Sequence, residues 1–220
     1  MKFRLTSRFL TGMLRFMLSI IDLARPVIAE AWNLLPAAKT EAVIAKIRLV
    51  DLGAVHGTYH PDTGVLDLNP SIFDPGERID DQGGEHPRRR PYASRAVHTV
   101  LHELSHAIGD GTGLDRIPEW LALSGWVLDR DDASGYGRYM EIRPGWSYGP
   151  SEWRFKHGSF FPRMYSSKSP QEQFADVCTY RALGWIHVFQ SSGRALLDYV
   201  DRHVWGRSFA ASWFQRRRVA

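Results

Sequence analysis

Two histidines and a glutamate occur at metal-binding spacing within residues 100–109, VLHELSHAIG. In an α-helix, His102 and His106 lie on one face, so both imidazoles can reach the same metal ion, while Glu103 projects beside them. Zinc lowers the pKa of a bound water toward about 7, and a carboxylate that does not bind the metal can take the proton as that water attacks a carbonyl. The pattern therefore predicts a hydrolytic zinc site with Glu103 as general base.

The residues around this motif predict the helix that it needs. No proline or glycine interrupts residues 95–108, and one face is apolar, with Val100, Leu101, Leu104, Ala107 and Ile108. His98 continues the histidine stripe, but residues eight apart are separated by about 12 Å along a helix, so we exclude it from the site. The alternative is a structural helix with two hydrogen-bonded histidines, although burying two histidines and a glutamate without a common partner is costly.

A catalytic zinc takes three protein ligands and a water, so a third ligand must come from elsewhere in the chain. A metzincin-type site would follow a glycine, here Gly109, with a ligand at Thr112, and threonine is not a zinc ligand. Asp115 in GTGLD resembles the GTxxD motif of aspzincins, although residues 116–118 depart from that family. Glu172, further downstream, is the third candidate.

Glu172 belongs to residues 169–184, SPQEQFADVCTYRALG, which predict a second helix. Ser169 is the expected N-cap, Pro170 the first helical residue and Gly184 the stop. Asp176 lies one turn after Glu172, where its carboxylate can accept a hydrogen bond from the second nitrogen of a ligating imidazole. Ser169 and Glu172 also match a capping box, which would explain the glutamate without a metal.

The order of the two motifs resembles the gluzincin class of zinc peptidases. In the branch similar to anthrax lethal factor, HExxH is followed by an ExFA[DE] helix, and here HELSHAIG is followed by PQEQFAD. That branch also carries a tyrosine seven residues before the glutamate ligand, which is the position of Tyr165. The resemblance covers the motif helix and residues 160–182, less than a quarter of the chain.

The resemblance implies a role for each matching residue. It implies zinc ligation by His102, His106 and Glu172, proton transfer by Glu103, a hydrogen bond from Tyr165 to the developing oxyanion, and support of a ligating histidine by Asp176. Gln173 and Cys178 stand where bulky apolar residues are usual in that helix. This departure concerns local packing rather than ligation.

The composition is that of a folded, mildly basic protein. The 220 residues are 44% hydrophobic and 12% aromatic, which suffices for one well-packed domain. A net charge of +4 creates no extreme field, so no nucleic-acid partner is expected. The arginine triplet at residues 88–90 is interpreted as solvated charge and the one at 216–218 as a frayed basic tail, with contact to a nucleic acid or another polyanion as the alternative. With Cys178 as the one cysteine, an intrachain disulfide is excluded and a reducing compartment is expected.

Residues 1–35 form a basic and apolar N-terminal segment. Its charge-free part, residues 16–21, is too short for a signal-peptide core or a transmembrane span, so we expect a cytoplasmic protein encoded by a bacterium or a phage. The apolar residues recur at helical spacing and predict an amphipathic helix that ends before Pro26. We expect it to pack on the domain of residues 36–220, with a partner or a membrane surface as the alternative contact.

Further elements are predicted around the two motifs. They are a helix over residues 37–50, a β-hairpin over 54–70, an exposed loop over 74–91, a helix over 119–127 followed by irregular chain, and a closing helix over 186–204. The hairpin is the candidate edge beside the motif helix, where an extended substrate would pair. His56 and His60 are expected on the hairpin surface and His157 in a surface loop, away from the metal.

These features predict an α+β zincin-like metallopeptidase domain, mostly helical, with a small antiparallel sheet or hairpin beside the active-site helix. It would use Zn²⁺ to hydrolyse a peptide or amide bond in a peptide or protein substrate. The alternative is a catalytically inactive zinc-binding structural or interaction protein on the same fold. Glu103 and Tyr165 favour the enzyme, because a structural site completes its coordination with a fourth protein ligand and does not need a free carboxylate.

Overall fold

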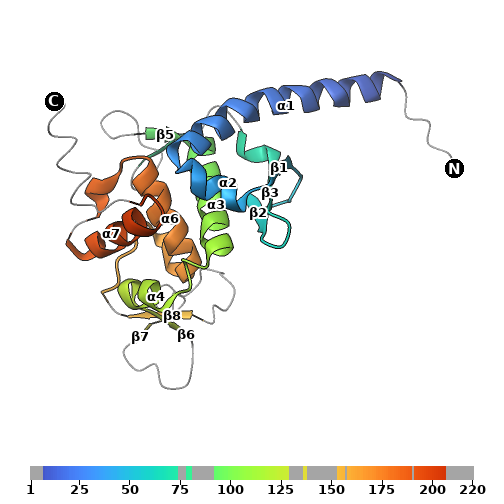
Figure 1. Ribbon diagram of the computed structural model, residues 1–220. Helices are drawn as coiled ribbons and strands as arrows, with labels where there is room; N and C mark the ends of the chain where they lie inside the picture. Colours follow the sequence, from blue (N-terminus) through green and yellow to red (C-terminus); the bar gives the residue numbers. More distant parts are fainter. Residues whose placement is uncertain are drawn as a thin grey trace.

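A computed structural model describes residues 7–73, 78–80, 92–128, 136–137, 153–156, 158–189 and 191–206 (Figure 1). The α-helices are α1 (Ser7–Leu34), α2 (Ala37–Val43), α3 (Arg95–Thr112), α4 (Pro118–Ser124), α6 (Pro170–Ala182) and α7 (Arg194–His203). The strands are β1 (Lys46–Leu49), β2 (Gly57–His60), β3 (Val65–Leu68), β4 (Arg78–Asp80), β5 (Tyr92–Ser94), β6 (Trp126–Leu128), β7 (Tyr136–Gly137) and β8 (Trp153–Lys156). Short 3₁₀ turns are η1 (Pro70–Phe73), η2 (Met164–Lys168), η3 (Ile186–Val188) and η4 (Ser191–Gly193). This mixture of helices and small sheets confirms the α+β class.

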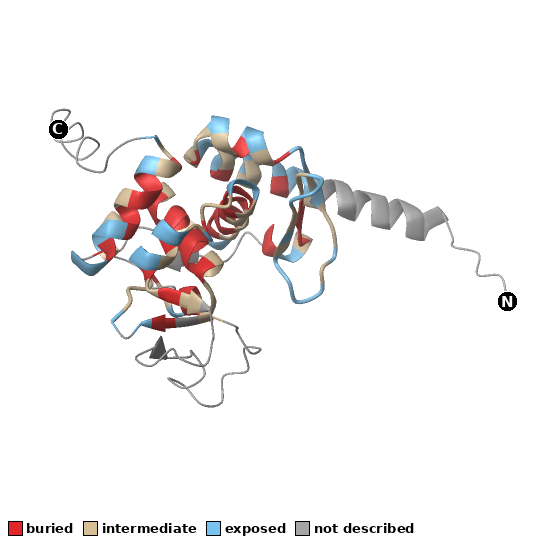
Figure 2. Ribbon diagram, turned by 60° about the horizontal axis from the view of Figure 1, so that its bottom comes forward, coloured by how far each residue is buried: buried red, intermediate tan, exposed pale blue. Residues whose placement is uncertain are grey.

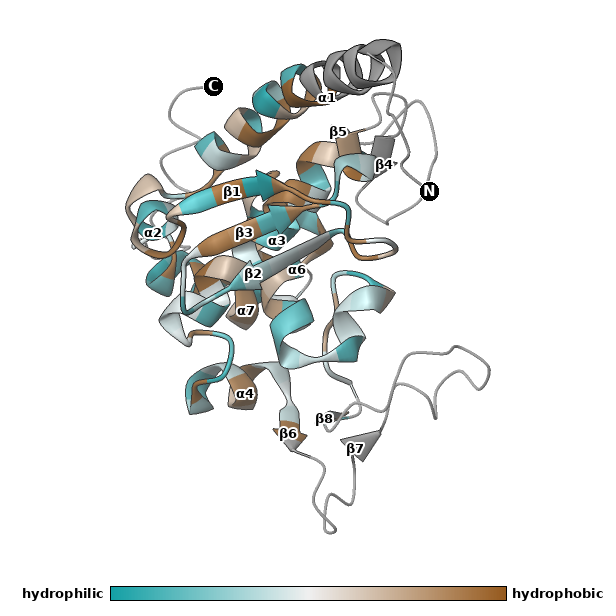
Figure 3. Ribbon diagram, turned by 90° about the vertical axis from the view of Figure 1, so that its right-hand side faces the viewer, coloured by the Kyte–Doolittle hydropathy of each residue, from teal (hydrophilic) through white to brown (hydrophobic). Residues whose placement is uncertain are grey.

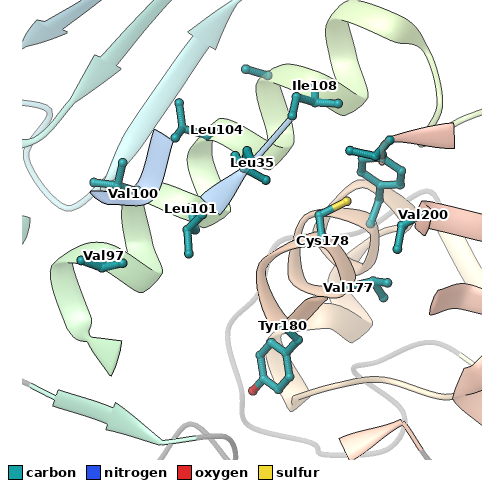
Figure 4. Packing of buried hydrophobic residues seen from close by; sticks show 14 of the residues in the cluster. Leu35, Val97, Val100, Leu101, Leu104, Ile108, Val177, Cys178, Tyr180 and Val200 are labelled. Atoms are coloured by element: carbon teal, nitrogen blue, oxygen red, sulfur yellow. The ribbon is translucent and has the colours of Figure 1, made fainter. Parts of the chain in front are cut away.

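Helix α3 runs through the centre of the molecule, where it packs against α6, α1 and the sheet formed by β1, β3 and β2. Burial is concentrated on the central helices in Figure 2. Leu101, Leu104 and Ile108 of α3 are completely buried, and Figure 4 shows them in one cluster with Leu35 and Val177. The helix that carries the motif is therefore held on several sides by apolar contacts.

Both ends of α3 are defined by local signals. The hydroxyl of Ser94 accepts a hydrogen bond of 3.0 Å from the backbone N–H of Val97, and Gly113 ends the helix in the left-handed conformation with a φ of 74°. The helix predicted over residues 95–108 is confirmed and continues to Thr112. Because Gly109 lies inside the helix, it does not make the glycine turn of a metzincin site.

The prediction that the first helix ends before Pro26 is wrong, since α1 continues to Leu34. A proline inside a helix removes one hydrogen bond and costs about 3 kcal/mol. Here Pro26 is exposed, so water can satisfy the carbonyl of Asp22 one turn earlier. Ala24 and Ala31 on either side are buried in the core, and this packing holds the helix together across the proline.

The helix predicted over residues 37–50 is also wrong in its second half. Helix α2 ends at Val43, and Ile44 is already extended, with φ −106° and ψ 107°. Strand β1 then pairs in parallel with β3, from Lys46 opposite Val65 to Leu49 opposite Leu68. A short apolar run is compatible with a helix or a strand, and the pairing with a distant strand decides for the strand.

The predicted hairpin is confirmed by the antiparallel pairing of β2 with β3, in which His60 faces Val65. The strand order is β1-β3-β2, so β2 forms one edge of this sheet and β1 the other. Figure 3 shows the three strands side by side, with α1 next to β1. Helix α3 contacts β2 and β3, which places the hairpin beside the motif helix, as expected.

Between the two motif helices, the prediction of a helix followed by irregular chain is only partly right. Helix α4 ends at Ser124, and Gly125 follows with a φ of 80°. The next residues form β6, which pairs with β8, and β8 pairs with β7. Likewise, the closing helix predicted over residues 186–204 consists of η3, η4 and the shorter α7. The short strands in this region contain glycine and aromatic residues but no sustained alternation of polar and apolar residues, so the sequence pattern did not predict them.

Helix α6 begins and ends as predicted. The hydroxyl of Ser169 accepts a hydrogen bond of 3.2 Å from the backbone N–H of Glu172, and the chain turns at Gly184 with a φ of 75°. Gln173 stands where an apolar residue is usual, and it is buried. Its amide oxygen accepts a hydrogen bond of 2.5 Å from the indole N–H of Trp126, and its amide nitrogen donates one of 2.6 Å to the carbonyl of Phe160. Its polarity is therefore satisfied, and it ties α6 to neighbouring chain segments.

Some predictions concern other parts of the chain. Of the exposed loop over residues 74–91, the structure describes β4, which pairs with β5. The arginine triplets at 88–90 and 216–218, and His157, lie outside the described residues.

Among the described helices, none is both long enough and apolar enough to cross a membrane.

Candidate metal centre

Three of the predicted ligands meet where α3 faces α6. The Nε2 atoms of His102 and His106 are 3.1 Å apart. The Oε2 atom of Glu172 lies 3.0 Å from the first and 3.2 Å from the second. Among the described residues, these three form the group whose ligand atoms converge closely enough to hold a metal ion.

The dimensions of this triangle fit a tetrahedral zinc ion. Nitrogen and oxygen ligands at about 2.0–2.1 Å from zinc are about 3.3 Å apart when the angles between them are tetrahedral. The observed sides of 3.0–3.2 Å are close to that value. Two imidazoles and one carboxylate also form a common donor set for catalytic zinc, and the fourth position stays available for water.

The hydrogen bonds of His102 favour a cation at the centre of the triangle. Its Nδ1 lies 2.9 Å from the Oδ1 atom of Asp176, an ionised carboxylate that can only accept, so Nδ1 carries the proton. In the neutral imidazole, Nε2 then presents a lone pair toward the carboxylate of Glu172 and the ring of His106. Such an arrangement is stable only if a proton or a metal ion lies between these atoms.

The charges around His102 are strongly coupled. Burial disfavours the charged imidazole, but the carboxylates of Asp176 and Glu172 outweigh it and raise the pKa of His102 to about 10. Burial alone would raise the pKa of both carboxyl groups. The two histidines nevertheless lower the pKa of Glu172, and His102 together with Arg163 lowers the pKa of Asp176. Both acids are therefore negatively charged at any ordinary pH, as metal binding requires.

Asp176 is itself held by residues that precede α6. The guanidinium of Arg163 donates to both of its oxygens, at 2.8 Å through Nε and 2.7 Å through its terminal nitrogen. The hydroxyl of Ser166 donates to Oδ2 at 2.6 Å. Asp176 is fully buried, and these donors compensate the cost of burying its charge while they fix the orientation of His102.

Glu103 lies in the same cleft but outside the ligand triangle. The cleft has a volume of about 640 Å³, and its walls include α3, residues 54–59 around the start of β2, and the turn η2. The side chain of Glu103 passes close to Gly57, where an added Cβ would lie 2.6–2.8 Å from its Cγ, Cδ and Oε2 atoms. The carboxylate of Glu103 thus lines the same cleft as the triangle and is not one of its three converging ligands.

Tyr165 lines the same cleft as the triangle and Glu103. Its ring is 5.8 Å from the ring of His102, measured between centroids, and the ammonium of Lys168 stands 3.8 Å above it. Burial raises the pKa of the Tyr165 phenol, and the charges of Glu172 and Glu103 raise it further. The phenol therefore keeps its proton and remains a hydrogen-bond donor within the cleft.

Asp115, the alternative third ligand, does not join the triangle. Its side chain is 1% exposed and points at α3, where an added Cβ on Gly109 would lie 3.0 Å from its Oδ2 atom. Its Oδ1 atom accepts a hydrogen bond of 3.1 Å from the guanidinium of Arg116, and its Oδ2 atom has no hydrogen-bond partner among the described residues. Burial raises the pKa of Asp115 to about 6.

The raised pKa of Asp115 predicts that its carboxylate lowers the stability of the fold at high pH. Because the folded pKa of about 6 exceeds the ordinary value of 3.8, the folded state favours the protonated acid, and stability falls as the pH rises through 6. Asp115→Asn should therefore be more stable than the wild type at pH 8 by about 2 kcal/mol, and the difference should shrink toward pH 4.5. Urea unfolding at both pH values measures it. Asp62→Asn, at an exposed turn residue, should show no such pH dependence, and an equal effect there would contradict the prediction.

The other described histidines, including His56, His60 and His98, are outside the triangle. His60 lies on β2, 3.1 Å from the carboxylate of Asp67, and His56 is exposed at the mouth of the cleft. His98 is buried between the rings of Tyr180 and Trp185, at centroid distances of 6.1 and 6.0 Å. These positions agree with the interpretation that none of the three is a ligand.

Arg163, Ser166 and Gly57 were not predicted as parts of the site. A buried aspartate requires charged or hydroxyl partners, but nothing in the local pattern says which residues provide them. Gly57 did carry a signal, because a glycine inside a predicted strand often marks a close approach of another group.

Comparisons of the chain with protein-family models, with curated proteins and with solved structures find no match. Its function must be inferred from the side chains themselves.

Proposed function

We propose that this protein is a zinc-dependent metallopeptidase with a zincin-like fold, and that His102, His106 and Glu172 are its metal ligands. The convergence of these three donors within 3.2 Å of one another carries the proposal. It is supported by the position of Glu103, which lines the same cleft and stands outside the triangle. A ligand set of three and an adjacent free carboxylate are what hydrolytic zinc chemistry requires.

Zinc bound at this triangle would supply a water of lowered pKa and would polarise the carbonyl oxygen of the substrate. Glu103 accepts the proton of the attacking water as the new C–O bond forms. It then delivers this proton to the nitrogen of the leaving amine as the C–N bond breaks. The products are a carboxylic acid and an amine, and Glu103 returns to its starting charge.

Tyr165 and β2 position the reacting groups in this proposal. The phenol of Tyr165 stays protonated and donates a hydrogen bond to the oxygen that becomes negatively charged. Strand β2 is an edge strand of its sheet and lines the cleft, so an extended peptide can pair with its free edge. Asp176 holds the Nδ1 proton of His102 throughout.

The competing function is a zinc-binding protein without catalytic activity. Such a site gains stability from a closed coordination sphere and has no need of an open cleft. Among the described residues no fourth ligand joins the triangle, and Glu103 and Tyr165 line the same cleft, which favours the peptidase.

Metal analysis combined with a peptide library tests the proposal. The purified chain should contain about one equivalent of zinc by mass spectrometry and should cleave members of the library. Removing the metal with a chelator should abolish cleavage, and adding zinc should restore it. Zinc at full occupancy with no cleavage of any peptide or amide would favour the inactive alternative, whereas a chain that binds no zinc would exclude both.

Gly57→Ala tests whether the wall of the cleft positions Glu103. The new methyl group would overlap the Glu103 side chain, so the carboxylate must move while the strand is retained. We expect turnover to fall on the order of a hundredfold, with little change in KM or zinc content. Thr58→Ala changes the neighbouring strand residue without adding an atom near Glu103 and serves as the control. Equal turnover in the two variants would show that the contact does not position the base.

A further inference from the structure

Helix α1 and strand β1 form an apolar groove far from the metal centre in the fold. The groove has a volume of about 700 Å³, and η1 contributes to it through Pro70. It lies along β1, at one edge of the sheet, whereas the cleft of the metal centre lies along β2, at the other edge. Figure 3 shows α1 next to β1 on this side of the molecule.

The described part of α1 exposes apolar side chains here. Ile21, which lines the groove, is 41% exposed. The lining of the groove is apolar except for Arg25 and Asn33, and it includes the half-buried ring of Trp32. An aliphatic and aromatic surface that includes an arginine is typical of a helix lying at the boundary between lipid headgroups and acyl chains.

The positive charges of the N-terminal segment indicate a negatively charged partner. Lys2, Arg4, Arg8 and Arg15 all precede the first acidic residue, Asp22. The remaining residues before Asp22 are mainly Leu, Met, Phe and Ile. A segment that combines positive charges with apolar side chains matches an anionic surface with an apolar interior.

We propose that α1 and its groove bind the surface of an anionic phospholipid bilayer. The apolar face enters the headgroup boundary, and the arginines contact lipid phosphates. A second copy of this chain is a poorer occupant, because it would bring the same positive charges against each other. The proposed attachment is to the membrane surface, as a basic and apolar helix favours. The catalytic cleft, on the opposite edge of the sheet, then remains accessible.

Vesicle flotation with the full chain tests this proposal independently of any peptidase activity. The chain should float with phosphatidylcholine vesicles that contain about a third phosphatidylserine, and should bind pure phosphatidylcholine vesicles at least about tenfold more weakly. Raising the salt concentration to 0.5 M should weaken binding to the anionic vesicles, because it screens the charge attraction.

Two matched pairs of variants locate the surface. Ile21→Gln should weaken binding on the order of tenfold, because it removes an apolar side chain from the boundary, whereas Leu123→Gln, with the same 41% exposure on α4, should not. Arg15→Gln should weaken binding about fivefold, and Lys156→Gln, at an exposed residue of β8, should not.

Equal binding to neutral and anionic vesicles would overturn the proposal. It would also be overturned if, in each matched pair, the α1 variant and its control weakened vesicle binding equally. Concentration-dependent dimerisation that Ile21→Gln abolishes, without any vesicle binding, would overturn it in favour of a second copy of the chain. Sedimentation velocity distinguishes this outcome.

Discussion

Glu103→Gln should leave a protein that binds zinc at full occupancy and hydrolyses its substrate on the order of a thousandfold more slowly. Glutamine has nearly the same shape as glutamate, and residue 103 lies outside the ligand triangle, so the metal and the fold are retained. The neutral amide cannot accept the proton of the attacking water, so the loss should appear in turnover with KM nearly unchanged. Metal content by mass spectrometry and steady-state cleavage of a library-derived peptide measure the two quantities.

Asp110→Asn is the matched control for this prediction. It removes a negative charge from the same helix and the same cleft, two turns after Glu103, where Asp110 is paired with Arg116. If both variants lose activity equally, the effect reflects the charge of the cleft rather than proton transfer. If Glu103→Gln remains fully active with its zinc bound, the proposed mechanism is wrong.

Glu172→Ala should lose zinc. The change removes one of three donors and leaves two imidazoles, so we expect affinity to fall by more than about a hundredfold, beyond the range found for residues that only support a ligand. Titration with zinc in competition with a chelating dye measures the affinity. Dialysis followed by mass spectrometry measures the content.

Asp115→Ala is the control, because Asp115 is the other candidate for the third ligand and is buried next to α3. This variant should retain zinc in the same titration. The opposite result, with zinc retained in Glu172→Ala and lost in Asp115→Ala, would transfer the third ligand to Asp115. Circular dichroism distinguishes loss of the metal from loss of the fold in either variant.

The sequence predicted both helices of the metal centre because their signals are local. Ser94 and Ser169 cap them, and each helix ends before a glycine with positive φ. The spacing of His102 and His106 on one face follows from helix geometry alone. The meeting of these histidines with Glu172 was expected from family resemblance, because no local rule brings together residues 66 or more positions apart.

What could not be predicted depends on contacts that are distant in sequence. Residues 46–49 form a strand because β3 pairs with them, and the helix continues past Pro26 because Ala24 and Ala31 are buried on either side. Arg163 and Ser166 reach Asp176 because of the path that the chain takes before α6. In each case tertiary packing outweighs or supplements the local preference.

The proposed ligands come from two helices, and His106 on α3 and Glu172 on α6 are 66 residues apart in the chain. A metal ion held by both would act as a reversible cross-link, and a covalent link that closes a loop of this size stabilises a protein by about 4 kcal/mol. Zinc binding would then be part of the folding free energy. In a cell short of zinc, the helices would separate more often and expose the chain to proteases, so the abundance of the protein would follow the supply of the metal.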